Sequence, residues 1–407
     1  MDRPYDGLAE KLLFSKEAAD YLGISVQRLA VLTKEGKIIP LKKNSSGTIY
    51  HIDELERRKM ELSIFSSGQV HPENGRKGEM FRIDGPVRNE ALNLAVVMNT
   101  LHVSEKKACS LLDSLDRRTA CEPLLDDIQS WQELLNIPRT SIVNEYEKAR
   151  DAFTSLHATD EIIRLGNPDY PVLLARTDEA PRFLYLRGRI GLLRDIRTVA
   201  LVGSRQAGDE GKRNTERVAR ILGANGIIIV SGLAKGIDVT AHRTALDNRM
   251  STIAVIGTNL NQYYPHENME VQKQIEHDGL VVSQFSPATK TERWFFPLRD
   301  GVMSGLSQAT VVMEAGETSG ALKQAQYALK QKRLVLIPQN VFNIPTISWP
   351  AKFEKLGAIR VKTPSEIIDV LSTHKVYRLD RPKSDLSYNL FAEDDLIVAD
   401  AVPEYEV

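Results

Sequence analysis

The sequence predicts an α/β protein built on a doubly wound, mostly parallel sheet. Residues 198–202 and 227–230 are short apolar runs rich in β-branched side chains, and each ends in a polar turn that contains glycine. Runs of this kind are typical of buried parallel strands. Residues 211–224, between the two runs, alternate apolar and charged side chains as an amphipathic crossover helix does. The three segments together predict one βαβ unit.

The same alternation of strand and helix continues along the chain. Further apolar runs with strand character lie at residues 251–257, 280–285, 309–316 and 334–338, and helical patterns separate them. Strands that alternate with helices predict a parallel sheet with helices on both faces, connected by right-handed crossovers. We assign residues 159–374 to this domain.

Residues 1–62 are predicted to form a winged helix-turn-helix. Two short amphipathic helices, which Ser15 and Ser25 can cap, flank a turn at Gly23, and a hairpin with a basic tip follows. This order resembles the MerR and excisionase type, in which the second helix enters the major groove and the wing contacts phosphate. The residues that the resemblance places on DNA are Gln27, Arg28, Lys34, Lys42 and Lys43. A small protein-binding helical module is the alternative.

The segments around the large domain differ from it in composition. Residues 63–87 are rich in Ser, Gly, Asn, Lys and Glu and are predicted to be a linker. Residues 88–158 have apolar positions at helical spacing, interrupted by Pro123 and Pro138, which predicts a small helical domain. Its role stays open between a packing platform and a sterile-alpha-motif-like or helix-hairpin-helix-like module. Residues 375–407 are predicted to be a flexible acidic tail.

The overall composition argues against several classes of protein. The 53 Lys and Arg residues balance the 54 Asp and Glu residues, so no global positive charge indicates nucleic acid, although a local basic groove remains compatible. The two cysteines, Cys109 and Cys121, suit neither a disulfide framework nor a zinc site. No apolar run approaches the roughly 20 residues of a transmembrane helix, and no signal peptide is recognisable. We expect a cytoplasmic protein without membrane contact.

The turns after the predicted strands suit an anionic ligand. Glycines let the backbone approach an anion closely, and the N–H groups of the following helices point toward the same edge of the sheet. Arg205 and Lys235 add full positive charges, and an arginine can bind a phosphate through two hydrogen bonds. The turns with these features are Gly203-Ser204-Arg205, Lys235-Gly236 and Ser319-Gly320.

A loop at residues 291–299 has a different character. It interleaves aromatic residues with arginines, among them Phe296 and Arg299. This pattern suits a platform on which a base stacks while nearby cations neutralise phosphates. We expect at least one of its three aromatic side chains to belong to the core instead.

No catalytic set is evident. The glycine patterns of dinucleotide-binding and P-loop proteins are missing, and no set of metal ligands occurs, so we predict neither a cofactor nor a metal. Asp238 and His242 stand one helical turn apart, but no nucleophile accompanies them, and the structural interpretation is favoured. Glu314 ends a predicted strand and either acts in catalysis or caps the next helix.

These motifs resemble those of the DNA-processing protein A family, also called DprA or Smf. The resemblance covers about residues 90–372, and its main segments are Val202–Arg205, Ser231–Asp238, Gly257-Thr258, Tyr264–Asn268, Phe296–Arg299, Glu314–Gly316 and Ser319-Gly320. It implies an extended Rossmann-like domain that binds single-stranded DNA without cutting it. It also implies loading of a RecA-type recombinase and a homodimer.

The resemblance also implies roles for single residues. Arg205 would hold a backbone phosphate, and Gly203 and Ser204 would shape that pocket. Phe296 and Arg299 would line the path of the strand.

The chain departs from the family pattern at two places. Phe295 stands where the family usually has Asn, and Arg299-Asp300-Gly301 lacks the second arginine of the family's Arg-Asn-Arg. Replacing a cation next to an aspartate weakens phosphate binding, so the departure predicts a lower DNA affinity or a different ligand. The winged helix, which the family often carries at its C-terminus, is here predicted at the N-terminus.

Two functions therefore stand side by side. The first is a non-catalytic protein that binds single-stranded DNA, with the N-terminal module adding duplex DNA or a protein partner. The second is a nucleotide-sensing or phosphoribohydrolase-like protein. Residues 314–324 match the glycine-rich motif of that group only in part. Lys323 and Gln324 stand near the place of that family's catalytic glutamate, which argues against hydrolysis. The pathway, whether transformation, recombination or phage defence, stays open.

Overall fold

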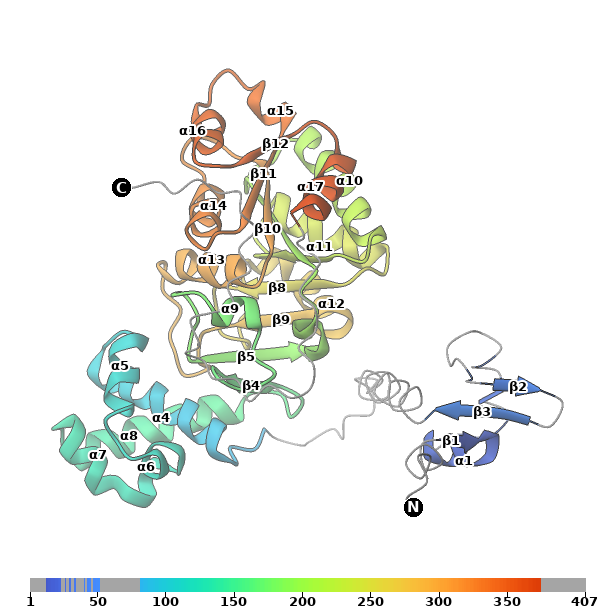
Figure 1. Ribbon diagram of the computed structural model, residues 1–407. Helices are drawn as coiled ribbons and strands as arrows, with labels where there is room; N and C mark the ends of the chain where they lie inside the picture. The colour runs from blue at the N-terminus through green and yellow to red at the C-terminus, as the bar shows by residue number, and fades with distance from the viewer. Residues whose placement is uncertain are drawn as a thin grey trace, which may run out of the picture. The chain divides into compact units, whose positions relative to one another are not determined.

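The computed structural model describes residues 12–22, 42–44, 47–51 and 81–374, together with Val26, Leu29-Ala30, Thr33 and Pro40. The chain divides into two compact units, residues 1–77 and residues 78–407 (Figure 1). Among the described residues, none of the helices is long and apolar enough to cross a bilayer.

The described part of the first unit contains a helix and a small antiparallel sheet. Its elements are β1 (Leu12–Phe14), α1 (Ser15–Leu22), β2 (Lys42–Asn44) and β3 (Gly47–His51), with strand order β1-β3-β2. Lys42 and Lys43 lie in β2, the outer strand of the predicted wing hairpin. Gln27, Arg28 and Lys34 lie outside the described residues, so the helix-turn-helix and its DNA contacts stay a prediction.

The second unit begins with a group of short helices. They are α4 (Pro86–Leu101), α5 (Glu105–Leu112), α6 (Arg117–Cys121), α7 (Ile128–Leu135) and α8 (Arg139–Thr154). Pro86 opens α4, where its fixed φ suits the first helical turn. Asp116 caps α6 by accepting the N–H groups of Arg118 and Thr119. Trp131 is fully buried among these helices, and Phe81, within the predicted linker, joins the same core.

A nine-stranded sheet follows, in the order β12-β11-β10-β6-β7-β8-β9-β5-β4. Strands β6 to β12 run parallel to one another, and β5 and β4 add an antiparallel edge. The strands are β4 (Glu161–Arg164), β5 (Phe183–Gly188), β6 (Thr198–Gly203), β7 (Ile228–Ser231), β8 (Thr252–Ile256), β9 (Leu280–Ser283), β10 (Ala309–Glu314), β11 (Leu334–Pro338) and β12 (Ile359–Val361). The prediction of a doubly wound, mostly parallel sheet is confirmed.

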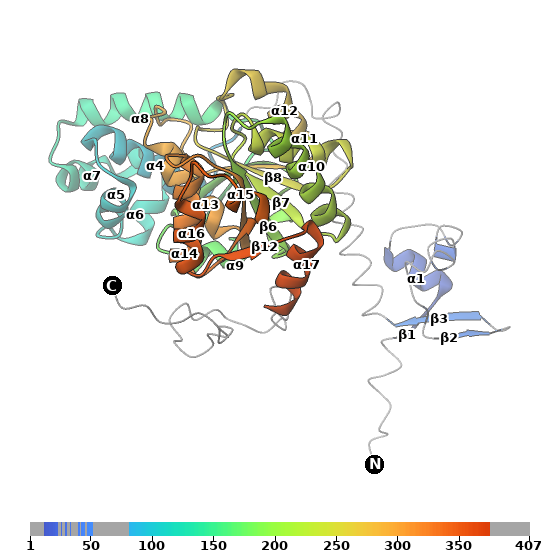
Figure 2. The same cartoon turned by 90° about the horizontal axis from the view of Figure 1, so that it is seen from above.

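Helices cover both faces of this sheet (Figures 1 and 2). One face carries α10 (Asp209–Ala224), α11 (Ile237–Asp247), α12 (Met269–Asp278) and α17 (Pro364–Thr373). The other carries α9 (Val172–Ala175), α13 (Phe295–Gly305), α14 (Gly320–Lys330), α15 (Gln339–Phe342) and α16 (Trp349–Lys355). Along β6, Val199 and Leu201 pack against the helices of the first face, whereas Ala200 and Val202 pack against those of the other face. Successive side chains of a strand point to opposite faces.

The strand order reverses beside β6. From β6 the chain proceeds through β7 and β8 to β9 on one side, and from β10 through β11 to β12 on the other. In open α/β sheets such a switch point leaves a crevice at the carboxyl ends of the strands, where ligands bind. The turns after β6 and β10 therefore mark the first place to look for a site.

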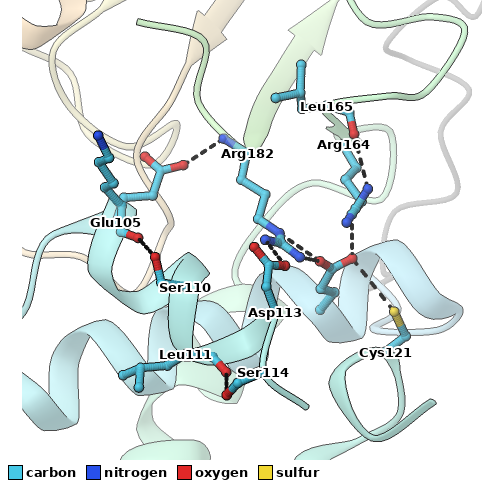
Figure 3. A network of polar contacts seen from close by, with 11 residues as sticks. Glu105, Ser110, Leu111, Asp113, Ser114, Cys121, Arg164, Leu165 and Arg182 are labelled. Carbon is cyan, nitrogen blue, oxygen red and sulfur yellow. Dashed lines mark hydrogen bonds and ion pairs between the residues drawn. The ribbon is translucent and has the colours of Figure 1, made fainter. Parts of the chain in front are cut away.

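A network of ion pairs joins the short helices to the antiparallel edge of the sheet (Figure 3). Glu90 of α4 is almost fully buried and accepts hydrogen bonds from Arg164 Nε at 2.7 Å and Arg182 Nε at 2.8 Å. Arg182 also donates to Asp113 at 2.7 Å through its side chain and to Glu105 at 2.7 Å through its backbone N–H. Burial raises the pKa of Glu105 to about 7. This network fixes α4 and α5 against β4 and β5.

Candidate nucleic-acid interface

The turn after β6 places Gly203, Ser204 and Arg205 at the switch point. The Ser204 N–H donates to the Glu314 carbonyl at 2.6 Å, and the Ile237 N–H donates to the Ser204 carbonyl at 3.2 Å. A Cβ on Gly203 would lie 2.7 Å from the Glu314 carbonyl oxygen, so only glycine fits. Arg205 is exposed, and its side chain has no hydrogen bond or ion pair within the part of the chain that the structure describes. A rigid turn thus presents an unpaired cation.

Glu314 caps the helix that follows this turn. Its Oε1 accepts the Gly208 N–H at 3.2 Å, at the N-terminus of α10, and a Cβ on Gly211 would collide with its carboxylate. The capping alternative for Glu314 therefore matches the structure. Because Glu314, Asp209 and Glu210 already place negative charge at this helix end, α10 does not offer its dipole to an anion. Anion binding here depends on Arg205.

The turn after β7 packs directly on the turn after β6. Gly236 has φ +74°, and a Cβ there would collide with the Ser204 and Arg205 carbonyl oxygens. Lys235 is exposed and pairs with Glu267 at 2.5 Å. Both side chains of this pair are half exposed, so it contributes at most about 1 kcal/mol and can open for a phosphate. Gly203, Ser204, Arg205 and Lys235 together are called the switch-point site below.

The aromatic loop divides between core and surface. Phe295 is buried and stacks on Phe285 with a centroid distance of 4.0 Å. Phe296 is half-buried over the end of β8, where a Cβ on Gly257 would lie 2.6 Å from its ring. Its ring centroid lies 5.1 Å from that of Tyr264, which is 52% exposed. We call Tyr264 and Phe296 the aromatic pair.

Sequence reasoning missed Tyr264 as a surface aromatic. It appeared only as part of a family motif, Tyr264-Pro265, because nothing local predicts that the loop after β8 folds back onto the start of α13. Trp294, at the start of the same helix, is 55% exposed. Exposed aromatic rings beside cations are what an unpaired base needs for stacking.

Arg299 lies inside the protein, contrary to the expectation that it lines an open path. Its side chain is 5% exposed, and its Nη1 donates to the carbonyl oxygens of Gly232 and Val255, each at 2.5 Å. Its Nε donates to Asp300 at 3.1 Å. Arg299 follows Phe295 by four residues and shares the buried face of α13. It therefore joins the ends of β7 and β8 and positions the site instead of contacting a strand.

The buried Arg299 has two acidic neighbours. Burial raises the pKa of Asp300 to about 6, with Arg299 opposing and Asp238 adding to this shift. Burial also raises the pKa of Asp238, whose carboxylate accepts the N–H groups of Gly232 and Ala234. The positive charge of Arg205 opposes the rise in both pKa values.

Ser319 and Gly320 stand on the other side of the switch point, after β10. Ser319 is the N-cap of α14 and accepts the Ala321 N–H at 3.3 Å. Gly320 is exposed, and a Cβ there would meet nothing within 4 Å. Glu317 fixes the preceding loop by accepting the Ser348 N–H at 2.8 Å and hydroxyl at 2.6 Å. These bonds hold the pKa of Glu317 at about 2.

Asp238 and His242 do not form a catalytic pair. His242 is fully buried and bonds Thr252 Oγ1 through Nδ1 at 2.7 Å, whereas Asp238 bonds backbone N–H groups. Burial lowers the pKa of His242 to about 3, so its imidazole is neutral at physiological pH. Within the described residues no group of three or more His, Cys, Asp or Glu side chains could hold a metal ion. The cations and aromatic rings at this edge of the sheet can bind a ligand.

Residues 161–372, just over half of the chain, match the family model of DNA recombination-mediator protein A. The chain belongs to this family. The Smf protein of Escherichia coli is 33% identical over 278 residues, which cover 68% of this chain and 71% of that protein. The DprA protein of Streptococcus pneumoniae is 40% identical over 176 residues.

The crystal structure of the Streptococcus pneumoniae DprA protein has the same fold. It aligns with a TM-score of 0.53 and 28% identity over 70% of this chain and 95% of that chain. Two of the matched relatives are longer than the region they share with this chain. The match spans 60% of the Streptococcus pneumoniae DprA sequence and 44% of the Smf protein of Synechocystis. The family match begins at residue 161 and leaves out the first unit.

Proposed function

We propose that this protein binds single-stranded DNA at the carboxyl edge of its sheet and assists DNA recombination without acting as an enzyme. One observation carries the proposal: the rigid turn after β6 presents the unpaired Arg205 on the same edge as Lys235 and the aromatic pair. Proteins that bind single strands without sequence preference combine such cations with rings on which bases stack. The family, described as a recombination mediator, supports the same assignment.

Each residue has a role that follows from its surroundings. Arg205 binds a backbone phosphate, and Gly203 and Ser204 hold the turn close enough for that contact. The Lys235 ammonium group releases the Glu267 carboxylate and binds a second phosphate in its place. Phe296 and Tyr264 provide the stacking surface. We propose that Ser319 and Gly320 border the strand across the switch point, and that Arg299 positions the site from below.

The nucleotide-processing alternative is weaker. A phosphoribohydrolase of the predicted type needs a carboxylate near residue 324, and Gln324 occupies this position. Its side chain is buried and donates to Thr310 Oγ1 at 3.0 Å. Glu314 is engaged at the N-terminus of α10. We therefore infer a binding protein.

The partners follow from the family. We propose a RecA-type recombinase and a second copy of this chain as partners of the second unit, and duplex DNA or a protein as the partner of the N-terminal module. A cytoplasmic location agrees with the free thiols of Cys109 and Cys121.

Fluorescence anisotropy with a labelled oligothymidylate tests this function. We expect Arg205→Ala to weaken binding by about tenfold and to reduce the slope of log affinity against log salt by about 0.7, the share of one phosphate contact. Arg220→Ala is the matched control, because this exposed arginine lies in the second half of α10 and, among the residues that the structure describes, pairs with Glu216 alone. Equal affinities of the two variants would refute the assignment. Release of free base from nucleotides, measured by chromatography, would refute the non-enzymatic assignment.

A further inference from the structure

We propose that a second subsite for nucleic-acid backbone lies where α8 meets the loops after β8 and β9, and that it binds the same single strand beyond the aromatic pair. The proposal rests on the proposed function and extends it from one site to a path. A cleft of about 330 Å³ occupies this place. Its polar lining residues are Glu145, Lys148, Asn259, Gln262, Thr289 and Lys290.

The walls of this junction cleft are held in fixed positions. The buried Asn259 follows β8, and its Nδ2 donates to the carbonyl oxygens of Thr289 at 3.3 Å and Pro287 at 3.5 Å after β9. Asn99 of α4 donates to Glu145 of α8 at 3.0 Å and to the Ala288 carbonyl at 3.1 Å. Side-chain amides therefore connect both loops to each other and to the helices. A ligand would meet a preformed cleft.

The charge of the cleft favours an anion. Lys148 is 74% exposed and lies 3.6 Å from Glu145. Lys290 is exposed and has no hydrogen bond or ion pair to any other residue that the structure describes. Two cations and one carboxylate thus line the cleft, and that carboxylate also accepts a hydrogen bond from Asn99. The lining combines amide, hydroxyl and ammonium groups with the small apolar side chains Ala149, Ala152, Pro287 and Ala288. The two ammonium groups suit a phosphate backbone.

The order of strands makes the cleft a continuation of the first site. Arg205 follows β6, Lys235 follows β7, the aromatic pair lies over the end of β8, and Lys290 follows β9. These parallel strands are neighbours in this order, so their ends lie along one edge of the sheet. Three inter-strand spacings of about 4.8 Å separate the first end from the last by about 14 Å.

The loop after β8 lines the cleft with Asn259 and Gln262 and also carries Tyr264 of the aromatic pair. Thr291 Oγ1 donates to Gln262 Oε1 at 2.5 Å, which joins the loop before Trp294 to the loop before Tyr264. A chain of nucleotides stacked on Tyr264 would therefore reach the cleft next. A mononucleotide in the switch-point site would not reach it.

The test compares two oligonucleotide lengths on the full-length chain. An oligothymidylate of about 2 nucleotides is too short to extend from the switch-point site to the cleft, whereas about 20 nucleotides reach the cleft as well. The variant Lys148→Ala with Lys290→Ala removes both cations of the cleft. Lys106→Ala with Lys107→Ala, on exposed positions of α5, removes the same charge elsewhere on the helical region. Thermal melting checks that both variants remain folded.

We expect the cleft variant to bind the long oligonucleotide about tenfold more weakly, with a salt slope smaller by about 1.4, the share of two phosphate contacts. Its affinity for the short oligonucleotide and both affinities of the α5 variant should stay unchanged. Unchanged binding of the long oligonucleotide, or an equal loss at both lengths, would overturn the cleft while the proposed function stands. A wild-type protein that binds neither length would overturn both.

Discussion

At the scale of single residues, two arginines that the sequence placed on the same DNA path have different surroundings. Arg205 faces solvent, whereas Arg299 is buried against two backbone carbonyl groups. The positive charge of Arg205 opposes the rise in the pKa of the carboxyl group of Asp300, next to Arg299. The edge of this chain therefore carries an acid near its exposed cation, and the protonation of that acid affects the local charge.

The pH dependence of DNA binding follows from Asp300. Burial raises the pKa of its carboxyl group to about 6, so the group is mostly charged at pH 7.5 and mostly neutral at pH 5.5. Loss of this negative charge near Arg205 should strengthen oligonucleotide binding severalfold as the pH falls through 6. Asp300→Asn should bind more tightly at pH 7.5 and lose most of this pH dependence, as anisotropy titrations at both pH values would show.

An identical pH dependence of oligonucleotide binding in the Asp300→Asn variant would contradict the role of Asp300.

At the scale of elements, a buried carboxylate connects the short helices to the sheet. Glu90 of α4 is 2% exposed and forms ion pairs with both Arg164 and Arg182 of the antiparallel edge. Among the described residues, this carboxylate is the one ion-pair partner that the two arginines share. The junction cleft depends on the same placement of the helices beside the loops.

Removing that carboxylate should destabilise the second unit. Glu90→Ala leaves two partly buried guanidinium groups without their main partner, and breaking a buried pair of this kind costs about 3 kcal/mol or more. We expect the free energy of unfolding, measured by urea denaturation, to fall by about that amount. Glu133→Ala, an exposed position on α7, is the control and should change it by less than about 0.5 kcal/mol. A similar stability of both variants would show that the network contributes little.

At the scale of the whole molecule, the family domain follows a separate N-terminal unit. The family match begins at residue 161, and the first unit contains the predicted winged module with Lys42 and Lys43 on β2. If this module contacts duplex DNA, the two units bind different forms of DNA.

Charge reversal in the predicted wing tests this division. Lys42→Glu with Lys43→Glu should weaken binding of duplex DNA about tenfold or more in the full-length chain, because two phosphate contacts become repulsive. Binding of single-stranded oligothymidylate should not change. Electrophoretic mobility shifts with both forms of DNA measure the difference. Unchanged duplex binding would favour the protein-binding alternative for this module.

Much of the fold and part of the site could be predicted from local sequence. The β-branched runs that became β6 to β11 and the glycine turns after them depend on neighbouring residues, so their pattern was sufficient. Gly203 and Gly236 were recognisable because only glycine allows the close approach of the two turns. The positions of Arg205 and Lys235 at one edge follow from the parallel order of β6 and β7.

The tertiary structure decided which of these side chains face a ligand. Arg299 looked like a DNA contact in the sequence. In the structure it lies on the buried face of α13 and donates to the carbonyl oxygens of Gly232 and Val255. Glu314 binds the N-terminus of α10 because β10 and β6, far apart in the sequence, are neighbours in the sheet. Lys148 and Lys290 line one cleft because α8 lies beside the loop that follows β9. The sequence by itself thus determined the α/β architecture, the glycine turns and the family. Packing between distant elements determined which charges are exposed, because burial depends on neighbours that local patterns do not contain.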